Sequence, residues 1–160
     1  DEPARRITEQ SAGPLFGDTV EPDDLAGGTI YVLRSKSAHP YVDEHRNLIH
    51  KIGVTGQPVA SRIANAKNDP TFLLADVEVV AEYRLYNINR TKLENLIHRA
   101  LAPARLDLSA GDRFGKTVQP REWFLAPLSA IDELVAKISD GSVTAYRYDL
   151  TQARFVREGD

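Results

Sequence analysis

The feature that most constrains the fold is the regular alternation of apolar and polar side chains over residues 77–85. Five apolar residues take every second position, and Val80 breaks the pattern; the five are Val77, Val79, Ala81, Tyr83 and Leu85. A period of two places these five side chains on one face of a β-strand. The charged residues between them would then face solvent, which is typical of a half-exposed strand in an antiparallel sheet.

The segments around this strand predict further strands and helices in a mixed order. β-branched and aromatic residues predict strands over residues 29–34, 48–55 and 122–125. Apolar residues at helical spacing predict helices over residues 58–68, 89–102 and 128–139. A long loop at residues 35–47 separates the first two strands, and residues 143–148 and 152–157 are expected to pair as a small hairpin.

Consecutive strands that are joined by a loop favour an α+β fold. We expect a small central sheet of antiparallel or mixed pairing, flanked by helices. The domain should span residues 28–140, with residues 141–160 as a C-terminal hairpin extension. Residues 1–27 are rich in Pro, Gly, Asp and Glu and show no period, so an acidic linker or loosely docked arm is expected there.

Composition excludes several classes of protein. A chain of 160 residues fits one domain, and no apolar run approaches the length that a membrane span needs. The chain contains no Cys, which excludes a disulfide framework, a thiolate nucleophile and a Cys-based zinc site. The lack of disulfides favours a cytoplasmic location. The chain also contains no Met and begins Asp-Glu-Pro, so we expect a piece of a longer protein.

The formal net charge of −3 hides an uneven distribution. Residues 1–28 carry a net charge of −5, whereas residues 29–160 carry +2. Within the latter, residues 84–121 hold eight bases against three acids, a net of +5. A local basic field suits a polyanion. Scattered charge on a solvated surface is the simpler explanation of the charge pattern alone.

Glu94 has two competing interpretations. Thr91 and Glu94 have the spacing of a capping box, which would make Glu94 part of a helix start with no chemical role. Against this, Glu94 and His98 are four residues apart and share one helical face, where a carboxylate could bind a metal ion. Considered alone, this helix favours the capping box.

Several residues in chain order resemble motifs of the GIY-YIG nuclease superfamily, in its divergent phage-type branch. The matching positions are Thr29-Ile30-Tyr31, Lys51-Ile52-Gly53, Arg62 in the next predicted helix, Glu94 in the segment LENLIHRAL, and Glu122-Trp123-Phe124. The resemblance covers about residues 28–139. It implies a GIY-YIG nuclease-like α+β fold and a metal-dependent phosphodiesterase.

The resemblance also implies roles for individual residues. Glu94 would hold one divalent ion, Mg²⁺ or Mn²⁺, and Arg62 would stabilise the phosphate. Tyr31 would act as the general base or orient it, although Lys51 in its neutral form is an open alternative. His98 is a supporting catalytic candidate. We expect the substrate to be bound by basic side chains, namely Arg99, Arg105, Arg113 and Lys116.

The resulting functional hypothesis is an endonuclease domain that hydrolyses DNA and serves as the cutting module of a longer protein. RNA is an alternative substrate. The chain could instead be a catalytically silent module that binds nucleic acid or docks to a protein, because Thr29 replaces the glycine of the first motif. The expected partners are DNA and other domains of the parent chain, with no membrane contact; the oligomeric state stays open.

Overall fold

The computed structural model describes residues 6–11, 27–86, 88–106 and 121–159. The strands are β1 (Arg6–Ser11), β2 (Gly28–Ser35), β3 (Ile49–Thr55), β4 (Val77–Tyr86), β5 (Trp123–Leu125), β6 (Tyr146–Asp149) and β7 (Arg154–Arg157). The α-helices are α1 (Pro40–Glu44), α2 (Val59–Ile63), α3 (Arg90–Ala100) and α4 (Leu128–Asp140). Short 3-10 helices are η3 (Ala66–Asn68), η4 (Pro70–Phe72), η5 (Ala102–Ala104) and η7 (Val143–Ala145).

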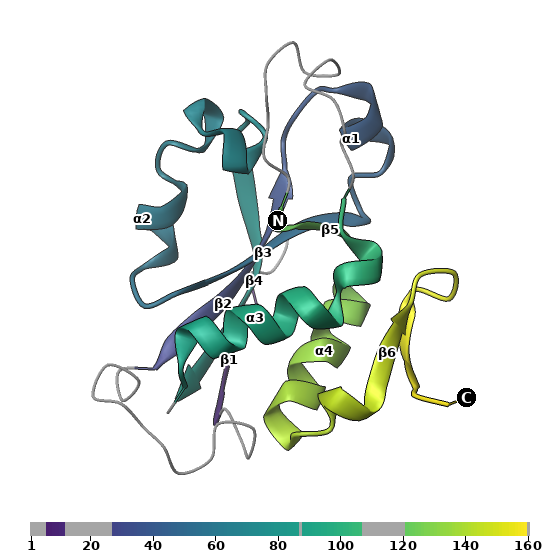
Figure 1. Ribbon diagram of the computed structural model, residues 1–160. Helices are drawn as coiled ribbons and strands as arrows, with labels where there is room; N and C mark the ends of the chain where they lie inside the picture. Colours follow the sequence, from purple (N-terminus) through teal and green to yellow (C-terminus); the bar gives the residue numbers. More distant parts are fainter. Residues whose placement is uncertain (1–5, 12–26, 87, 107–120, 160) are drawn as a thin grey trace.

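The predicted α+β class is confirmed. Five strands form one sheet in the order β1-β4-β2-β3-β5, and β6 pairs with β7 separately. All neighbours in the large sheet are antiparallel except β1, which runs parallel to β4. Helices flank this sheet, and α3 crosses in front of it in Figure 1. Among the described residues, no helix has the length and apolar character needed to cross a membrane.

The strand with the alternating pattern changes phase in its middle. Val32 of β2 pairs with Ala81, but the next residue, Leu33, pairs with Val79, so Val80 is an extra residue in a β-bulge. Val79 packs with Leu33 on one face of the sheet, whereas Ala81 packs with Val32 in the main core. The prediction that all five apolar residues share one face is therefore wrong, because the bulge shifts the period of two by one residue.

A second consequence concerns the polar side of this strand. Glu82 was expected to face solvent but is only 6% exposed. The reason is the face on which it lies: Glu82 is on the same face as Tyr31, and that face is covered by a second core that includes Tyr31. Glu82 also pairs with Tyr31 of β2, whose side chain is buried. The expectation of a half-exposed strand is thus wrong at this position.

The two faces of the sheet carry different cores. The main core packs β2, β3 and β4 against α3 and α4, through buried residues such as Leu93, Ile97, Ile131 and Leu134. On the other face, Tyr31 and Leu33 pack against Val59, Ala66 and Phe72, which come from α2, η3 and η4. The strand β3 consequently lies between two sets of helices, one set on each face of the sheet.

Other predicted elements differ in extent from the observed ones. The helix expected at residues 58–68 is divided into the short α2 and η3, and the long loop at residues 35–47 contains α1. The strand β1 lies within the segment expected to be an acidic linker or loosely docked arm. The third predicted helix is confirmed as α4, which ends at Gly141 with φ of 81°. The terminal hairpin is confirmed as β6 and β7.

Candidate functional site

Glu94 and His98 are positioned by the helix α3. Leu93 and Ile97 of this helix are buried in the main core, which fixes the rotation of the helix about its axis. Glu94 and His98 each follow one of these anchors, so they lie together along the flank of the buried stripe. Both side chains are half-buried.

The capping interpretation of Glu94 is wrong. The N-cap of α3 is Asn89, whose side chain accepts a hydrogen bond of 2.9 Å from the backbone N–H of Lys92. Thr91 is already inside the helix, so it cannot form a capping box with Glu94. The carboxylate of Glu94 is therefore available for another role.

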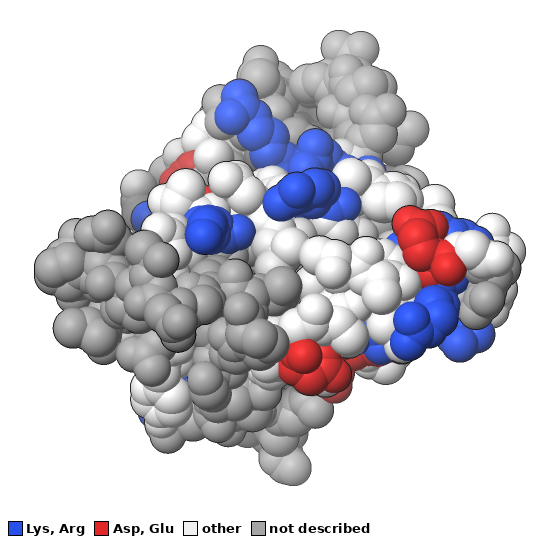
Figure 2. All heavy atoms as spheres, turned by 60° about the horizontal axis from the view of Figure 1, so that its bottom comes forward, with Lys and Arg blue, Asp and Glu red and all other residues white. Residues whose placement is uncertain are grey.

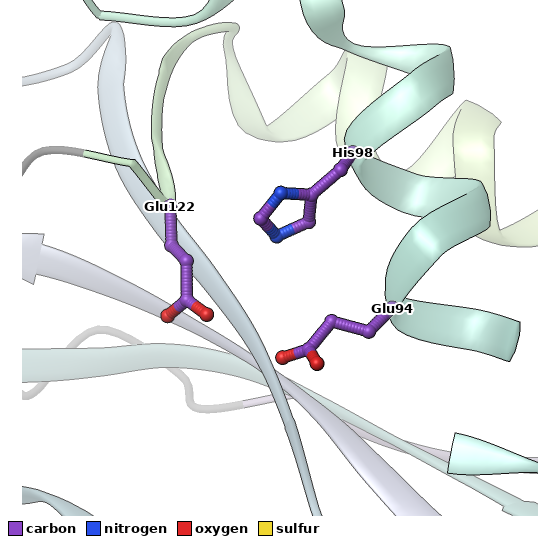
Figure 3. A group of neighbouring side chains, drawn as sticks. All are labelled: Glu94, His98 and Glu122. Carbon is purple, nitrogen blue, oxygen red and sulfur yellow. The ribbon is translucent and has the colours of Figure 1, made fainter. Parts of the chain in front are cut away.

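The carboxylate of Glu122, from a distant part of the sequence, lies beside Glu94 and His98. Glu122 directly precedes β5 and is held at the sheet edge, where its carbonyl accepts a hydrogen bond of 3.0 Å from Ile52 N–H of β3. Trp123 anchors the same strand, because it is fully buried and its Nε1 donates to the Thr71 carbonyl at 3.0 Å. Figure 3 shows the side chains of Glu94, His98 and Glu122 converging on one space.

The three side chains match the donor set of a divalent cation. Glu94, His98 and Glu122 each offer one ligand atom, and these atoms lie within 4.8 Å of one another. The Nε2 atom of His98 is buried and has no hydrogen-bond partner among the described residues. A buried polar atom without a partner is costly in a folded protein, and a bound cation would satisfy it. The cluster therefore fits a metal site.

The electrostatics of the cluster reflect two carboxyl groups in close contact. Burial raises the pKa of Glu94, and the adjacent Glu122 raises it further through its charge and a shared hydrogen bond. Burial also lowers the pKa of His98, which keeps its imidazole neutral. A neutral imidazole has a lone pair that a cation can use.

Lys51 supplies a buried positive charge beside the cluster. Its side chain is only 1% exposed, and its Nζ donates to Glu122 Oε1 at 2.5 Å. The ammonium group also lies 4.8 Å from the centre of the Phe72 ring. An ion-paired ammonium group has no lone pair with which to accept a proton. The position of Lys51 therefore fits a role in holding the Glu122 carboxylate in place.

Tyr31 lies on the same face of the sheet as Lys51. Tyr31 pairs with Gly53, and Leu33 pairs with Lys51, so Gly53 and Lys51 are alternate residues on one side of β3. A Cβ atom at Gly53 would lie 2.3 Å from the Tyr31 hydroxyl oxygen, which explains the glycine in the strand. Burial raises the pKa of Tyr31, although a hydrogen bond from Arg62 opposes this effect. The phenol is therefore protonated at neutral pH.

A cleft with a volume of about 400 Å³ opens over these groups. Its lining residues come from β3, α2, η4, α3 and the segments next to η5 and β5, and they are Lys51, Arg62, Thr71, Glu94, Asn95, His98, Arg105, Arg121 and Glu122. A second hollow shares Arg62 and Glu94 with this cleft and continues to Arg90. We refer to the two adjoining hollows together as the groove: Arg90 lines one, Arg105 and Arg121 line the other, and Glu94 lines both.

Most of the site residues proposed from sequence come together in this groove. Lys51, Arg62, Glu94, His98 and Arg105 line the cleft, and Tyr31 contacts it through Arg62. Arg99 lines a different hollow, between α3 and the β6–β7 hairpin. Arg113 and Lys116 lie outside the described residues.

Sequence reasoning missed Glu122, Arg121, Thr71 and Asn95 as possible site residues. For Glu122 a signal was present, because a charged residue directly before the buried pair Trp123 and Phe124 must lie where a strand reaches the surface. Nothing in the local sequence indicated that this point would face Glu94.

Comparisons with known proteins assign the family. The family model of the T5orf172 domain matches residues 28–139, so the chain belongs to that family. This finding corrects the resemblance to the GIY-YIG nuclease superfamily, which rested on tripeptides too short to decide membership. The chain is 42% identical over 138 residues to "Uncharacterized protein YeeC" of Bacillus subtilis (strain 168). The match covers 84% of this chain but only 35% of that relative. No solved structure matches this chain.

Proposed function

We propose that this T5orf172 domain hydrolyses phosphodiester bonds in DNA with the help of one divalent cation, Mg²⁺ or Mn²⁺. The observation that carries the proposal is the convergence of Glu94, His98 and Glu122 in a cleft that also presents Arg62 and Arg105. Carboxylates suit a cation, and arginines suit phosphate oxygens. A phosphodiester bound between them meets both groups at once.

The residues of the cleft have complementary tasks in this reaction. Glu94, His98 and Glu122 would hold the cation, whose chemistry would be to polarise a phosphoryl oxygen and to stabilise the departing oxygen. Arg62 is exposed at the cleft and offers hydrogen-bond donors to the charge that grows on the phosphate in the transition state. Tyr31 accepts a hydrogen bond from Arg62 and is protonated, so we assign it to positioning this arginine. Lys51 holds Glu122 through their ion pair.

The groove indicates how the substrate would lie. Arg90 in one hollow, and Arg105 with Arg121 in the other, place positive charge in both of the hollows that Glu94 lines. A strand that follows α3 would thus contact basic groups before and after the scissile phosphate. On the face shown in Figure 2, Lys and Arg form several separate groups with uncharged surface between them. We therefore expect weak, salt-sensitive binding and a targeting role for other parts of a longer protein.

The decisive experiment measures nicking of supercoiled plasmid by the wild type and Glu94→Gln, with Mg²⁺, with Mn²⁺ and with EDTA. EDTA should abolish nicking, and Glu94→Gln should lose it with either cation. Arg62→Gln should lower the rate by about 100- to 1,000-fold, the usual cost of one transition-state donor. Arg99→Gln is the matched control, because Arg99 lies outside the cleft and the variant should keep the wild-type rate.

Folding of the variants must be checked separately. The raised pKa of Glu94 means that its ionised form lowers the stability of the folded state at neutral pH. Glu94→Gln should therefore melt at the same temperature as the wild type or above it, as followed by circular dichroism. Equal nicking by wild type and Glu94→Gln would contradict the proposal. Binding of DNA or RNA without any cleavage would instead support a catalytically silent module, and cleavage of RNA alone would correct the substrate.

A further inference from the structure

We infer that the cluster of Glu94, His98 and Glu122 selects a transition-metal cation of the Mn²⁺ type over Mg²⁺, with Nε2 of His98 as a direct ligand. The inference rests on the proposed function, because it concerns the cation of the same cleft. It adds that His98 is a direct ligand and that the site prefers a transition-metal cation to Mg²⁺.

The composition of the donor set sets the preference. Mg²⁺ prefers oxygen ligands in a near-ideal octahedron and gives up its bound water reluctantly. An imidazole nitrogen suits transition-metal ions, while two carboxylates favour the harder members of that series. Two carboxylates with one imidazole, in an open cleft that leaves room for water and phosphate oxygens, therefore favour a transition-metal ion that accepts carboxylates, such as Mn²⁺, over Mg²⁺.

The His98 ring is already turned toward the carboxylates. One of its ring nitrogens points into the space between Glu94 and Glu122 in Figure 3. The ring meets Phe124 edge-on, with ring centres 5.8 Å apart and an angle of 87° between the planes. Phe124 is fully buried, so this contact restrains the imidazole on a rigid surface. The buried Nε2 has no hydrogen-bond partner among the described residues, so a cation could bind this nitrogen without breaking a hydrogen bond to any of them.

Lys51 increases the importance of the nitrogen ligand. The two carboxylates carry two negative charges when ionised, and the buried ammonium group of Lys51 offsets one of them through its 2.5 Å contact with Glu122. A site with less net negative charge attracts Mg²⁺ weakly, because the affinity of hard cations depends on ligand charge. The bond to His98 is then the part of the site that distinguishes Mn²⁺ from Mg²⁺.

Arg105 provides an internal check on this assignment. Its guanidinium lies 3.5 Å from Nδ1 of His98, at the outer limit of a hydrogen bond. A cation on Nε2 requires the ring proton on Nδ1, and Nδ1 could then no longer accept from Arg105. The exposed Arg105 side chain would have to turn away from the ring. Removing its guanidinium should therefore leave Mn²⁺ binding unchanged or make it tighter.

The test compares binding of Mn²⁺ and Mg²⁺ by isothermal titration calorimetry in the wild type, His98→Gln, Glu122→Gln and Arg105→Gln. The wild type should bind Mn²⁺ more tightly than Mg²⁺. His98→Gln should weaken Mn²⁺ binding about 10- to 100-fold and leave Mg²⁺ binding within about threefold. Glu122→Gln should weaken the binding of both cations, and Arg105→Gln should weaken neither.

Pulsed electron paramagnetic resonance of Mn²⁺ bound to the wild type gives a readout that needs no variant. A directly bound imidazole produces a nitrogen coupling, which should be present in the wild type and absent in His98→Gln. A wild-type spectrum without nitrogen coupling would overturn the inference, as would an equal loss of both cations in His98→Gln. Nitrogen-coupled Mn²⁺ with no cleavage of DNA or RNA would remove the proposed function and leave this inference standing. Cleavage of DNA without a nitrogen coupling would overturn this inference and leave the proposed function standing.

Discussion

His50 is a titratable residue that the fold holds in its neutral form. It is fully buried in β3, where Nδ1 donates to the Ala126 carbonyl at 2.7 Å and Nε2 accepts from Arg34 at 3.1 Å. Burial is the main cause that lowers the pKa of His50 to about 4, and the neighbouring charge of Arg34 contributes. His50 therefore contributes to structure, and its two ring nitrogens are already used.

This arrangement predicts a loss of stability in mild acid. In the unfolded chain His50 binds a proton near pH 6.5, whereas in the folded state it resists the proton until about pH 4. The contribution to stability is complete above pH 6.5 and is lost as the pH falls toward 4. Between pH 7 and 5 the free energy of unfolding should fall by about 2 kcal/mol from this group, as measured by urea titration.

His50→Gln serves as the control for this pH dependence. The variant should be less stable than the wild type at pH 7, because it cannot reproduce both hydrogen bonds. Its stability should change less between pH 7 and 5, because the titrating ring is gone. An unchanged slope in His50→Gln would show that another group causes the loss.

At the scale of the element, α3 carries Glu94 and His98, and its first turn depends on one polar side chain. Asn89 caps the helix through its hydrogen bond to Lys92 N–H, and Thr91 lies one position inside the first helical residue, Arg90. The guanidinium of Arg90 in turn donates to the Gly27 carbonyl at 2.9 Å. The bond from Arg90 attaches the start of α3 to the end of the sheet where β2 begins.

Substitution of the cap should destabilise the protein without altering the cleft directly. Asn89→Ala is expected to lower the free energy of unfolding by about 1 kcal/mol, because one N–H of the first turn loses its partner. Thr91→Ala is the matched control and should change stability by no more than about 0.5 kcal/mol. Chemical denaturation measures both values. A larger loss in Thr91→Ala than in Asn89→Ala would restore the capping box that the structure excludes.

At the scale of the whole molecule, the C-terminal hairpin is part of the main core. Tyr148 of β6 and Phe155 of β7 are both buried in it, with ring centres 5.1 Å apart. The backbone N–H of Phe155 also donates to Glu133 Oε1 of α4 at 3.0 Å. The region matched by the family model ends at residue 139, yet the core continues to residue 155.

The hairpin should therefore unfold together with the rest of the domain. Phe155→Ala is expected to cost about 3–5 kcal/mol, the usual loss for truncating a buried aromatic side chain. Leu150→Ala, at the half-exposed turn of the same hairpin, should cost no more than about 0.5 kcal/mol. Thermal unfolding followed by far-ultraviolet circular dichroism distinguishes the two. A small effect of Phe155→Ala would indicate a hairpin that is dispensable to the core.

The helix α4 illustrates what sequence patterns predict well. Its apolar residues recur at helical spacing, and Gly141 stops the helix in a conformation that glycine adopts at no cost. The strands β2 and β3 and the shared face of Glu94 and His98 were predicted on the same kind of local information. In each case the deciding interactions join residues that are near one another in the chain.

Other features depend on contacts between distant segments. The bulge at Val80 follows from how β4 pairs with β2, and β1 pairs in parallel with β4, which lies far from it in the sequence. Glu122 meets Glu94 and His98 only because β5 pairs with β3 beside α3. Register and packing of this kind cannot be read from a local period.

By itself, therefore, the sequence determined the α+β class, most of the elements and the shared helical face of Glu94 and His98. Only the tertiary structure decided that Glu122 lies beside Glu94 and His98, where the positive charge of Lys51 lies, and that Nε2 of His98 has no hydrogen-bond partner within the described part of the chain. The physical reason is that helical and strand periods come from the backbone of neighbouring residues, whereas a metal site requires side chains from separate elements at one point in space.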